Sequence, residues 1–163
     1  MKIEKASLQN LGDAMKIFAH ATDFMSRTGN PNQWINGYPS EAVINQDIAN
    51  GNFYICLAED GHMAGVFTFI TGDDPTYHII ENGAWLNDKP YGVIHRLASD
   101  GTQKGLAVFC IDWCFKKISN LRVDTHADNK VMQGILKKEG FKYCGIIYTH
   151  NGTERLAFQK CIL

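Results

Sequence analysis

Apolar residues recur at helical spacing in two stretches of the first fifty residues. The positions from Leu8 through Leu11, Met15 and Phe18 to Met25 fall on one helical face, and the segment 29–31, Gly-Asn-Pro, ends the pattern. A second apolar stripe, which includes Val43, Ile44 and Ile48, follows Ser40, a favourable N-cap residue. The chain is therefore predicted to open with two amphipathic helices after a short first strand.

Two further helices are predicted in the second half of the chain. The apolar run Val108–Ile118 follows a glycine-bearing turn and is long enough for a buried helix. Asp128 precedes a stripe that runs through Met132 and Ile135 to Leu136, and Gly140 ends it. We expect Asp128 to be the N-cap of this last helix.

Runs rich in β-branched and aromatic residues predict the strands. They are Lys2–Ala6, Phe53–Glu59, His62–Thr71, Tyr91–Ala98, Leu121–Thr125, Phe141–Thr149 and Glu154–Cys161. Asp-Gly at 60–61 and Asn-Gly at 151–152 favour tight hairpin turns between neighbouring strands, and the polar stretch 72–90 reads as a loop. The order β-α-α-β-β-β-α-β-α-β-β predicts a mixed sheet with helices on its faces, of the α/β or α+β class.

Composition limits the kind of protein this is. The 163 residues, 45% of them apolar and 20% charged, fit a single globular domain over 1–163. A net charge of -1 without a basic run gives no reason to expect nucleic acid or an anionic membrane as a partner. No signal peptide or membrane span is recognised, so a cytoplasmic location is expected. The five cysteines form no Cys-x-x-Cys pair, which predicts buried thiols and no metal site.

The turn between the strand Tyr91–Ala98 and the following helix carries the most chemistry. Its sequence is Ser-Asp-Gly-Thr-Gln-Lys-Gly-Leu-Ala over 99–107. The first N–H groups of a helix lack intrahelical partners and lie at the positive end of its dipole, so they bind anions. Lys104 precedes Gly105 and no Ser or Thr follows, which excludes a Walker loop, and the glycine spacing does not fit a dinucleotide fold.

The residues of this region resemble the GNAT superfamily of acyl-CoA-dependent N-acyltransferases. The family's pyrophosphate signature, Gln or Arg-x-x-Gly-x-Gly or Ala, is similar to Thr102-Gln103-Lys104-Gly105-Leu106-Ala107, with Thr102 departing from it. Asn129 resembles the asparagine that contacts the cofactor, and the pair 140–141 resembles the closing Gly-Phe. The resemblance implies a mostly antiparallel, twisted sheet and acetyl-CoA as co-substrate, bound by residues 102–107 and Asn129.

The same resemblance implies how the acyl group is held. In the family the thioester lies beside a β-bulge of the fourth strand, which corresponds to Leu97 and Ala98 here. The Leu97 backbone N–H is then expected to polarise the thioester carbonyl, a contribution on the order of 3 kcal/mol for one donor. An amine would attack directly in a ternary complex, since holding both reactants in line removes much of the entropic barrier.

Proton transfer has several candidates. Many family members carry a tyrosine acid where this chain has Leu136, so the thiolate leaves without that acid, Tyr143 or Tyr148 replaces it, or catalysis is impaired. Two histidines near the ends of strands, His126 first and His95 second, are the candidate bases. A structural role is the alternative for both: His126 as a capping or hydrogen-bonded residue of its loop, and His95 as a strand residue of which either it or Arg96 beside it faces solvent.

The acceptor is predicted only as an amine of a small molecule or peptide. Trp34 and Tyr38 are candidates for the walls of its pocket, and Glu81, with Asp73 and Asp74, is a candidate to attract a cation. Each also has an ordinary reading as a core aromatic or a solvated acid. A non-catalytic acyl-CoA sensor or interaction domain is the alternative function. The length of the acyl group and the choice between monomer and homodimer stay open.

Overall fold

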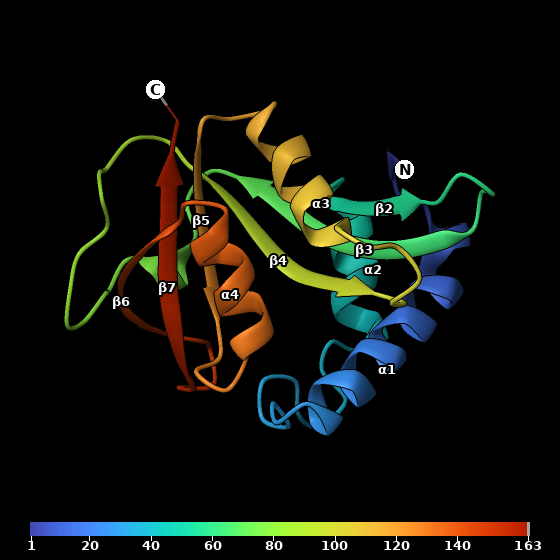
Figure 1. Cartoon of the computed structure of the whole chain (residues 1–163), viewed down its shortest axis with the longest axis horizontal. Coiled ribbons are helices and arrows are strands. Elements are labelled where there is room, and N and C mark those ends of the chain that lie inside the picture. The colour runs from blue at the N-terminus through green and yellow to red at the C-terminus, as the bar shows by residue number, and fades with distance from the viewer. Residues whose placement is uncertain (163) are drawn as a thin grey trace.

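The computed structural model describes residues 1–162 and contains one seven-stranded sheet between two layers of helices (Figure 1). Its elements are β1 (Lys2–Lys5), the 3-10 turn η1 (Leu8–Asn10), α1 (Leu11–Arg27), α2 (Glu41–Ala49), β2 (Phe53–Leu57), β3 (Met63–Thr71), the 3-10 turn η2 (Pro75–Tyr77), β4 (Gly92–Ser99), α3 (Leu106–Phe115), β5 (Asn120–Thr125), α4 (Lys130–Lys138), β6 (Lys142–Tyr148) and β7 (Glu154–Cys161). The predicted order of helices and strands is confirmed.

The strand order across the sheet is β1-β2-β3-β4-β5-β7-β6, and the fold is the predicted mixed, mostly antiparallel one. Within residues 1–162 the one parallel pair is β4 with β5, which is in register only at Gly92 with Leu121 and at Val93 with Arg122. Beyond these residues the two strands separate, which Figure 1 shows as a V in the middle of the sheet. Residues of both separated strands line a cavity, which is described below.

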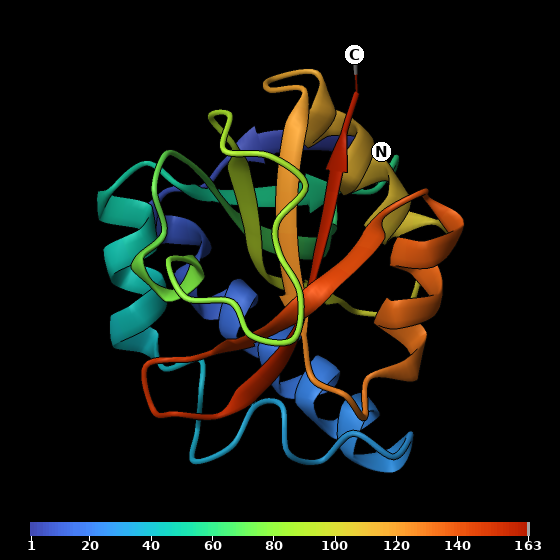
Figure 2. The same ribbon diagram turned by 90° about the vertical axis from the view of Figure 1, so that its left-hand side faces the viewer.

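Helices cover the sheet on both faces (Figure 2). On one face α1 and α2 pack through Ile17, Phe18 and Ile44 against a core cluster that includes Phe53 and Val66. On the other face α3 and α4 cover a larger cluster, which contains Phe67, Leu121, Leu136 and Phe158 among its buried side chains. Burial of these faces from water is the main source of stability for such a layered fold.

Two helix starts differ from the prediction. Residues 8–10 form the 3-10 turn η1, in which the Asn10 side chain accepts from the Ser7 N–H at 2.8 Å, and the α-helix begins only at Leu11. The expectation that Asp128 caps the last helix is wrong: Asn129 is the N-cap, and its Oδ1 accepts from the Met132 N–H at 3.0 Å. Both Asp and Asn are good caps, so the local sequence did not choose between these neighbours.

The segment 72–90, predicted to be a loop, is pinned to the sheet by aromatic residues. Arg122 of β5 lies with its guanidinium carbon 4.3 Å from the Trp85 ring centroid and 4.0 Å from that of Tyr91. Tyr77, in η2 of the same segment, is buried, and Trp85 Nε1 donates to the Tyr77 carbonyl at 2.9 Å. These contacts fix the position of Asp74, next to η2, over β4.

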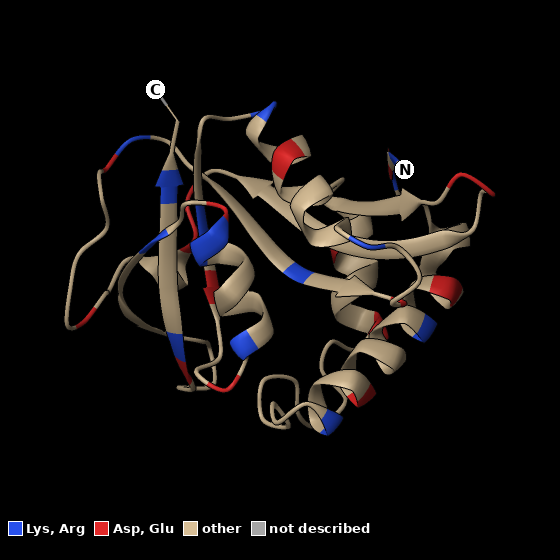
Figure 3. Ribbon diagram, in the orientation of Figure 1, with Lys and Arg blue, Asp and Glu red and all other residues tan. Residues whose placement is uncertain are grey.

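Charged residues and cysteines follow the expected pattern. Figure 3 shows Lys and Arg interspersed with Asp and Glu over the helices and strands. Four of the five cysteines are buried, as predicted, and burial raises the pKa of the Cys114 thiol well above its ordinary value. Within residues 1–162, none of the helices has the length and apolar character needed to cross a membrane. The same residues include no cluster of three or more His, Cys, Asp or Glu suited to a metal ion.

Candidate active site

A cavity of about 370 Å³ lies at the N-terminus of α3, between that helix, α1 and α4; we call it the α3 cavity. It is lined by Ala21, Phe24, Met25, Thr28, Trp34, Leu97, Ala98, Ser99, Gln103, Gly105, Leu106, Ala107, Val108, Asn129, Val131, Met132 and Ile135. Most of the predicted pyrophosphate turn therefore borders one cavity, together with Asn129 and the end of β4.

The start of α3 is open to an anion. Its N-cap is Gly105, which has φ +77, and no side chain within residues 1–162 caps the helix. The bond from the Phe109 N–H to the Gly105 carbonyl, at 3.0 Å, is the first of the helix. The N–H groups before Phe109 have no carbonyl of the preceding turn to bind, so they can donate to a ligand in the cavity.

Thr102, the residue that departs from the family signature, is engaged within its own turn. Its hydroxyl donates to Asp100 Oδ1 at 2.7 Å and lies 3.0 Å from His62 Nε2. Neither Thr102 nor Lys104 lines the α3 cavity, whereas Gln103, Gly105, Leu106 and Ala107 do. The part of the predicted pyrophosphate turn that borders the α3 cavity therefore offers main-chain N–H groups, and Thr102 does not take part.

A β-bulge interrupts β4 where the two cavities of the site meet. Val66 faces Ala98 and Thr68 faces His95, so Phe67 alone opposes both Arg96 and Leu97. Arg96 has φ +53, an uncommon conformation for a residue with a side chain. The predicted bulge near Leu97 is present, and Leu97 lines the α3 cavity as well as the one described next.

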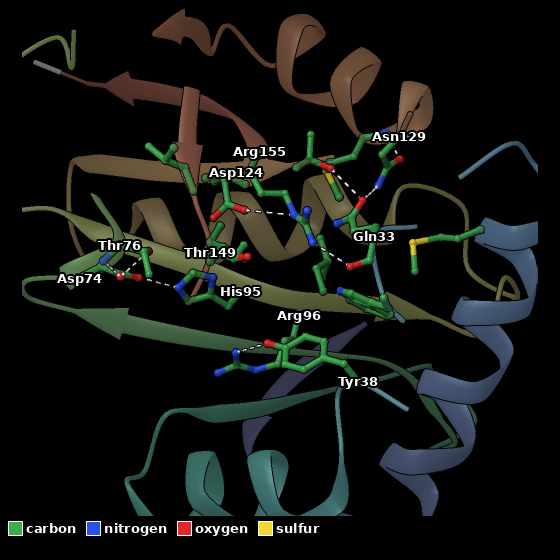
Figure 4. A pocket seen from close by; sticks show the side chains of 18 of the residues that line it. Gln33, Tyr38, Asp74, Thr76, His95, Arg96, Asp124, Asn129, Thr149 and Arg155 are labelled. Atoms are coloured by element: carbon green, nitrogen blue, oxygen red, sulfur yellow. Dashed lines mark hydrogen bonds and ion pairs between the residues drawn. The ribbon is translucent and has the colours of Figure 1, made fainter. Parts of the chain in front are cut away.

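The second cavity, of about 380 Å³, lies where β4 and β5 separate; we call it the β5 cavity (Figure 4). It is lined by Met25, Gln33, Trp34, Ile35, Tyr38, Asp74, Thr76, Ile94, His95, Arg96, Leu97, Ile111, Val123, Asp124, Thr125, Asn129, Met132, Leu136, Ile147, Thr149, His150, Asn151 and Arg155. The residues that line both cavities are Met25, Trp34, Leu97, Asn129 and Met132. The two cavities are thus neighbours with a common wall.

His95 and Asp74 form a pair on the wall of the β5 cavity. His95 Nε2 lies 2.8 Å from Asp74 Oδ2, and both side chains are largely buried. Because a carboxylate only accepts, Nε2 carries a proton, and in the neutral form of the imidazole Nδ1 then has the lone pair. Burial acts to raise the pKa of Asp74, but hydrogen bonds from His95 and Thr76 outweigh it and lower the pKa to about 2. The carboxylate is therefore charged and orients the imidazole.

The bulge residue Arg96 is neutralised by Asp47 of α2. Its Nε and Nη2 donate to the two carboxylate oxygens at 2.8 and 2.9 Å, and its Nη1 donates to the Tyr38 hydroxyl at 2.8 Å. Thr68 adds a third donor to Asp47, at 2.6 Å. This two-pronged ion pair ties the bulge to α2 and holds Tyr38 at the cavity wall.

A second ion pair, between Asp124 of β5 and Arg155 of β7, forms part of the wall of the β5 cavity. Arg155 Nε lies 4.0 Å from Asp124 Oδ1, and the side chains are only 9% and 13% exposed. Tyr77 donates to Asp124 Oδ2 at 2.6 Å, and Arg155 Nη2 donates to the Gln33 carbonyl at 2.7 Å. Burial and the nearby Asp124 raise the pKa of Tyr77 well above its ordinary value, so its hydroxyl stays protonated.

Comparison with solved structures finds the same fold in bacterial acetyltransferases. A GNAT-family acetyltransferase from Streptococcus agalactiae is 30% identical, with a TM-score of 0.89 over 99% of this chain and 95% of the other. The chain belongs to the GNAT family. A GNAT-family acetyltransferase from Listeria monocytogenes is 19% identical, with a TM-score of 0.72 over 99% of this chain and 94% of the other.

A more distant GNAT structure contains a ligand. The phosphinothricin acetyltransferase from Sinorhizobium meliloti, in complex with acetyl-CoA, is 12% identical, with a TM-score of 0.64 over 99% of this chain and 88% of the other. At this identity the likeness concerns the fold. No protein-family model matches the chain, and no curated protein sequence matches it either.

The GNAT fold brings only some of the predicted residues together. His95, Leu97, Asn129, Trp34 and Tyr38 all line the β5 cavity. Leu136, where many GNAT members carry a tyrosine, is fully buried and also lines it.

Other predicted residues lie outside both cavities. The Nδ1 of His126 accepts from the Asp128 N–H at 3.0 Å, which is the capping arrangement given above as its alternative. Tyr143 is half-exposed and packs its edge on Phe158. Glu81 accepts from the Tyr148 hydroxyl at 2.9 Å, in a contact that borders neither cavity.

Sequence reasoning missed Gln33, Asp124 and Arg155. The Gln33 Oε1 accepts from Asn129 Nδ2 at 2.8 Å and so links the loop after α1 to the start of α4. A faint signal existed for Arg155, since it alternates with Ala157 along β7 and both positions are buried. Gln33 gave no such signal, because its role depends on contacts 92 to 96 residues away along the chain.

Proposed function

We propose that this protein transfers an acetyl group from acetyl-CoA to a primary amine of a small molecule or peptide, by direct attack within a ternary complex. The observation that carries the proposal is the common wall of the two cavities at Leu97, Asn129 and Met132. The α3 cavity adjoins a helix N-terminus suited to phosphate. The β5 cavity is lined by the oppositely charged side chains Asp124 and Arg155, of which the carboxylate is suited to an amine. The acetyl-CoA complex of the Sinorhizobium relative supports the choice of donor.

The residues around the α3 cavity fit a coenzyme A diphosphate. The N–H groups at the start of α3 lack intrahelical partners, and an added Cβ at Gly105 would meet no protein atom within 4 Å, so this turn is open. Gln103, Gly105, Leu106 and Ala107 would hold the diphosphate through their main chain. When bound, acetyl-CoA supplies an activated thioester. The Leu97 N–H, at the bulge, is the proposed donor to its carbonyl oxygen.

His95 is the proposed base for the acceptor amine. An amine attacks only when neutral, and the Nδ1 lone pair of His95 can take its proton directly or through one water molecule. Asp74 fixes the tautomer and stabilises the imidazolium that forms. His126 was the first choice from sequence, but its Nδ1 is engaged with the Asp128 N–H. We therefore rank His95 above it.

The leaving thiolate has no tyrosine acid at position 136. Leu136 occupies the wall there, and Tyr143 and Tyr148 line neither cavity. We propose that the thiolate leaves without protonation by a side chain at this position. Loss of such an acid costs about 10²–10⁴-fold in rate, which slows acyl transfer without abolishing it.

The test measures thiol release from acetyl-CoA with a panel of polyamines, aminoglycosides, amino acids and peptide N-termini. We expect turnover with at least one class, and a loss of about 10²–10⁴-fold in kcat for His95→Gln. The matched variant His126→Gln should keep the wild-type pH profile. Binding of acetyl-CoA by calorimetry with no turnover of any amine would refute the proposal and favour an acyl-CoA sensor.

A further inference from the structure

The charged side chains that line the β5 cavity differ in how many of their polar atoms already have hydrogen-bond partners. Both oxygens of Asp74 accept hydrogen bonds, Oδ1 from Thr76 and Oδ2 from His95. Arg96 donates to both oxygens of Asp47 and to the Tyr38 hydroxyl. These groups have little capacity left for a ligand.

Arg155 and Asp124 differ from those groups. Of the five N–H groups of Arg155, one donates to the Gln33 carbonyl at 2.7 Å and one to the Glu154 carbonyl at 3.1 Å. Its Nε makes no hydrogen bond with residues 1–162 and faces Asp124 Oδ1 at 4.0 Å, beyond hydrogen-bond range (Figure 4). The two opposite charges are largely buried in the cavity wall, each with an unused hydrogen-bonding atom.

We propose that the acceptor is an α-amino acid or a closely related zwitterion, with its carboxylate on Arg155 and its amino group on Asp124. This specificity rests on the acetyl transfer proposed above and names the substrate class of that site.

The charge balance of the pair favours a ligand that carries both signs. A lone cation would satisfy Asp124 but repel Arg155, and a lone anion would do the reverse. A zwitterion adds no net charge and replaces one long contact with two short, charge-assisted ones. Because the two protein atoms are 4.0 Å apart, the ligand's two charged groups must lie close together, as they do in an α-amino acid, where both are attached to the same carbon atom.

The rest of the cavity fits the same class of ligand. A volume of about 380 Å³ holds a small molecule, and much of the wall is apolar, including Trp34, Ile94 and Val123. We therefore expect an uncharged, apolar side chain on the amino acid. A peptide N-terminus has no carboxylate beside its amine, and a polyamine brings only positive charge, so both should be poor acceptors.

The first experiment needs only the unmodified protein and three acceptors of matched size. Norleucine carries its ammonium and carboxylate groups on the same carbon atom. Its isomer 6-aminohexanoate carries them at opposite ends of the chain, and pentylamine lacks the carboxylate. We expect kcat/KM for norleucine to exceed both others by about tenfold to a hundredfold, the range for one hydrogen bond to a charged group. Equal or better kcat/KM for pentylamine would overturn the amino-acid specificity while leaving the acetyltransferase proposal intact.

The second experiment uses variants and a binding readout. Arg155→Gln should lose about tenfold to a hundredfold in kcat/KM for norleucine, and Arg155→Lys should recover part of this loss. The kcat/KM for pentylamine should rise in Arg155→Gln, because the charge that repels its ammonium group is removed. Coenzyme A affinity measured by calorimetry should be unchanged, because Arg155 does not line the α3 cavity, and this also verifies folding. If no amine is turned over, calorimetry with norleucine alone decides: binding weakened by Arg155→Gln supports the site, and no binding overturns it.

Discussion

Replacing Gly105 with glutamate tests the diphosphate site at the start of α3. Gly105 has φ +77, and a left-handed conformation costs a residue with a side chain about 1–2 kcal/mol. For a domain of this size each kcal/mol lowers Tm by about 2–4 °C, so we expect Tm to fall by about 2–8 °C. The fold should survive this loss, because it is a small part of typical domain stability.

The effect of Gly105→Glu on cofactor affinity should be much larger. A carboxylate placed about 4 Å from a phosphate charge is repelled by roughly 4 kcal/mol at an effective dielectric constant of 20, which is nearly a thousandfold in Kd. Rotation of the side chain and salt reduce this, so we expect Kd for coenzyme A to rise at least ~100-fold.

The matched control for this variant is Gly61→Glu. Gly61 also has a positive φ, +88, and open space around its Cβ position, but it lines neither cavity. Both variants should therefore show a similar fall in Tm by scanning calorimetry. Only Gly105→Glu should lose coenzyme A binding by titration calorimetry. Wild-type affinity in Gly105→Glu, or an equal loss in Gly61→Glu, would refute the assignment of the diphosphate to α3.

Two predictions concern stability. The folded-state pKa of Asp74, about 2, lies below its ordinary 3.8, so this group contributes about 2 kcal/mol of stability above pH 4 that is lost as the pH falls through 2. The free energy of urea unfolding of wild type minus that of Asp74→Asn should therefore shrink between pH 5 and pH 2, and a constant difference would contradict the folded-state pKa. Asp47→Asn leaves the largely buried Arg96 without its counter-ion and should cost about 3–5 kcal/mol in denaturant unfolding. The control Tyr38→Phe removes one hydrogen bond of Arg96 and should cost about 1–2 kcal/mol; equal costs would show that the ion pair does not anchor the bulge.

Local sequence determined the helices and strands and the proposed donor side of the site. The spacing of apolar residues predicts the helices, and the hairpin around Asp60-Gly61 follows from the backbone that glycine alone adopts readily. The proposed diphosphate turn is equally local, since strand, Gly105 and helix are adjacent in the chain. Asp128 and Asn129 are adjacent and are both favourable N-cap residues, so the sequence predicted a cap at this point but not which of the two supplies it.

Only the tertiary structure decided the acceptor side. The β5 cavity exists because β4 and β5 are paired over two residues and then diverge, and its polar wall joins Gln33, Asp74, Asp124 and Arg155 from separate elements. No spacing rule relates such residues, because their proximity follows from long-range strand pairing. The same packing ranks the histidines: His126 is held by its own loop, while His95 faces the cavity with Asp74 behind it. The sequence thus determined the turn proposed to hold the cofactor's phosphates, and the packing of distant strands decided which side chains line the proposed acceptor cavity.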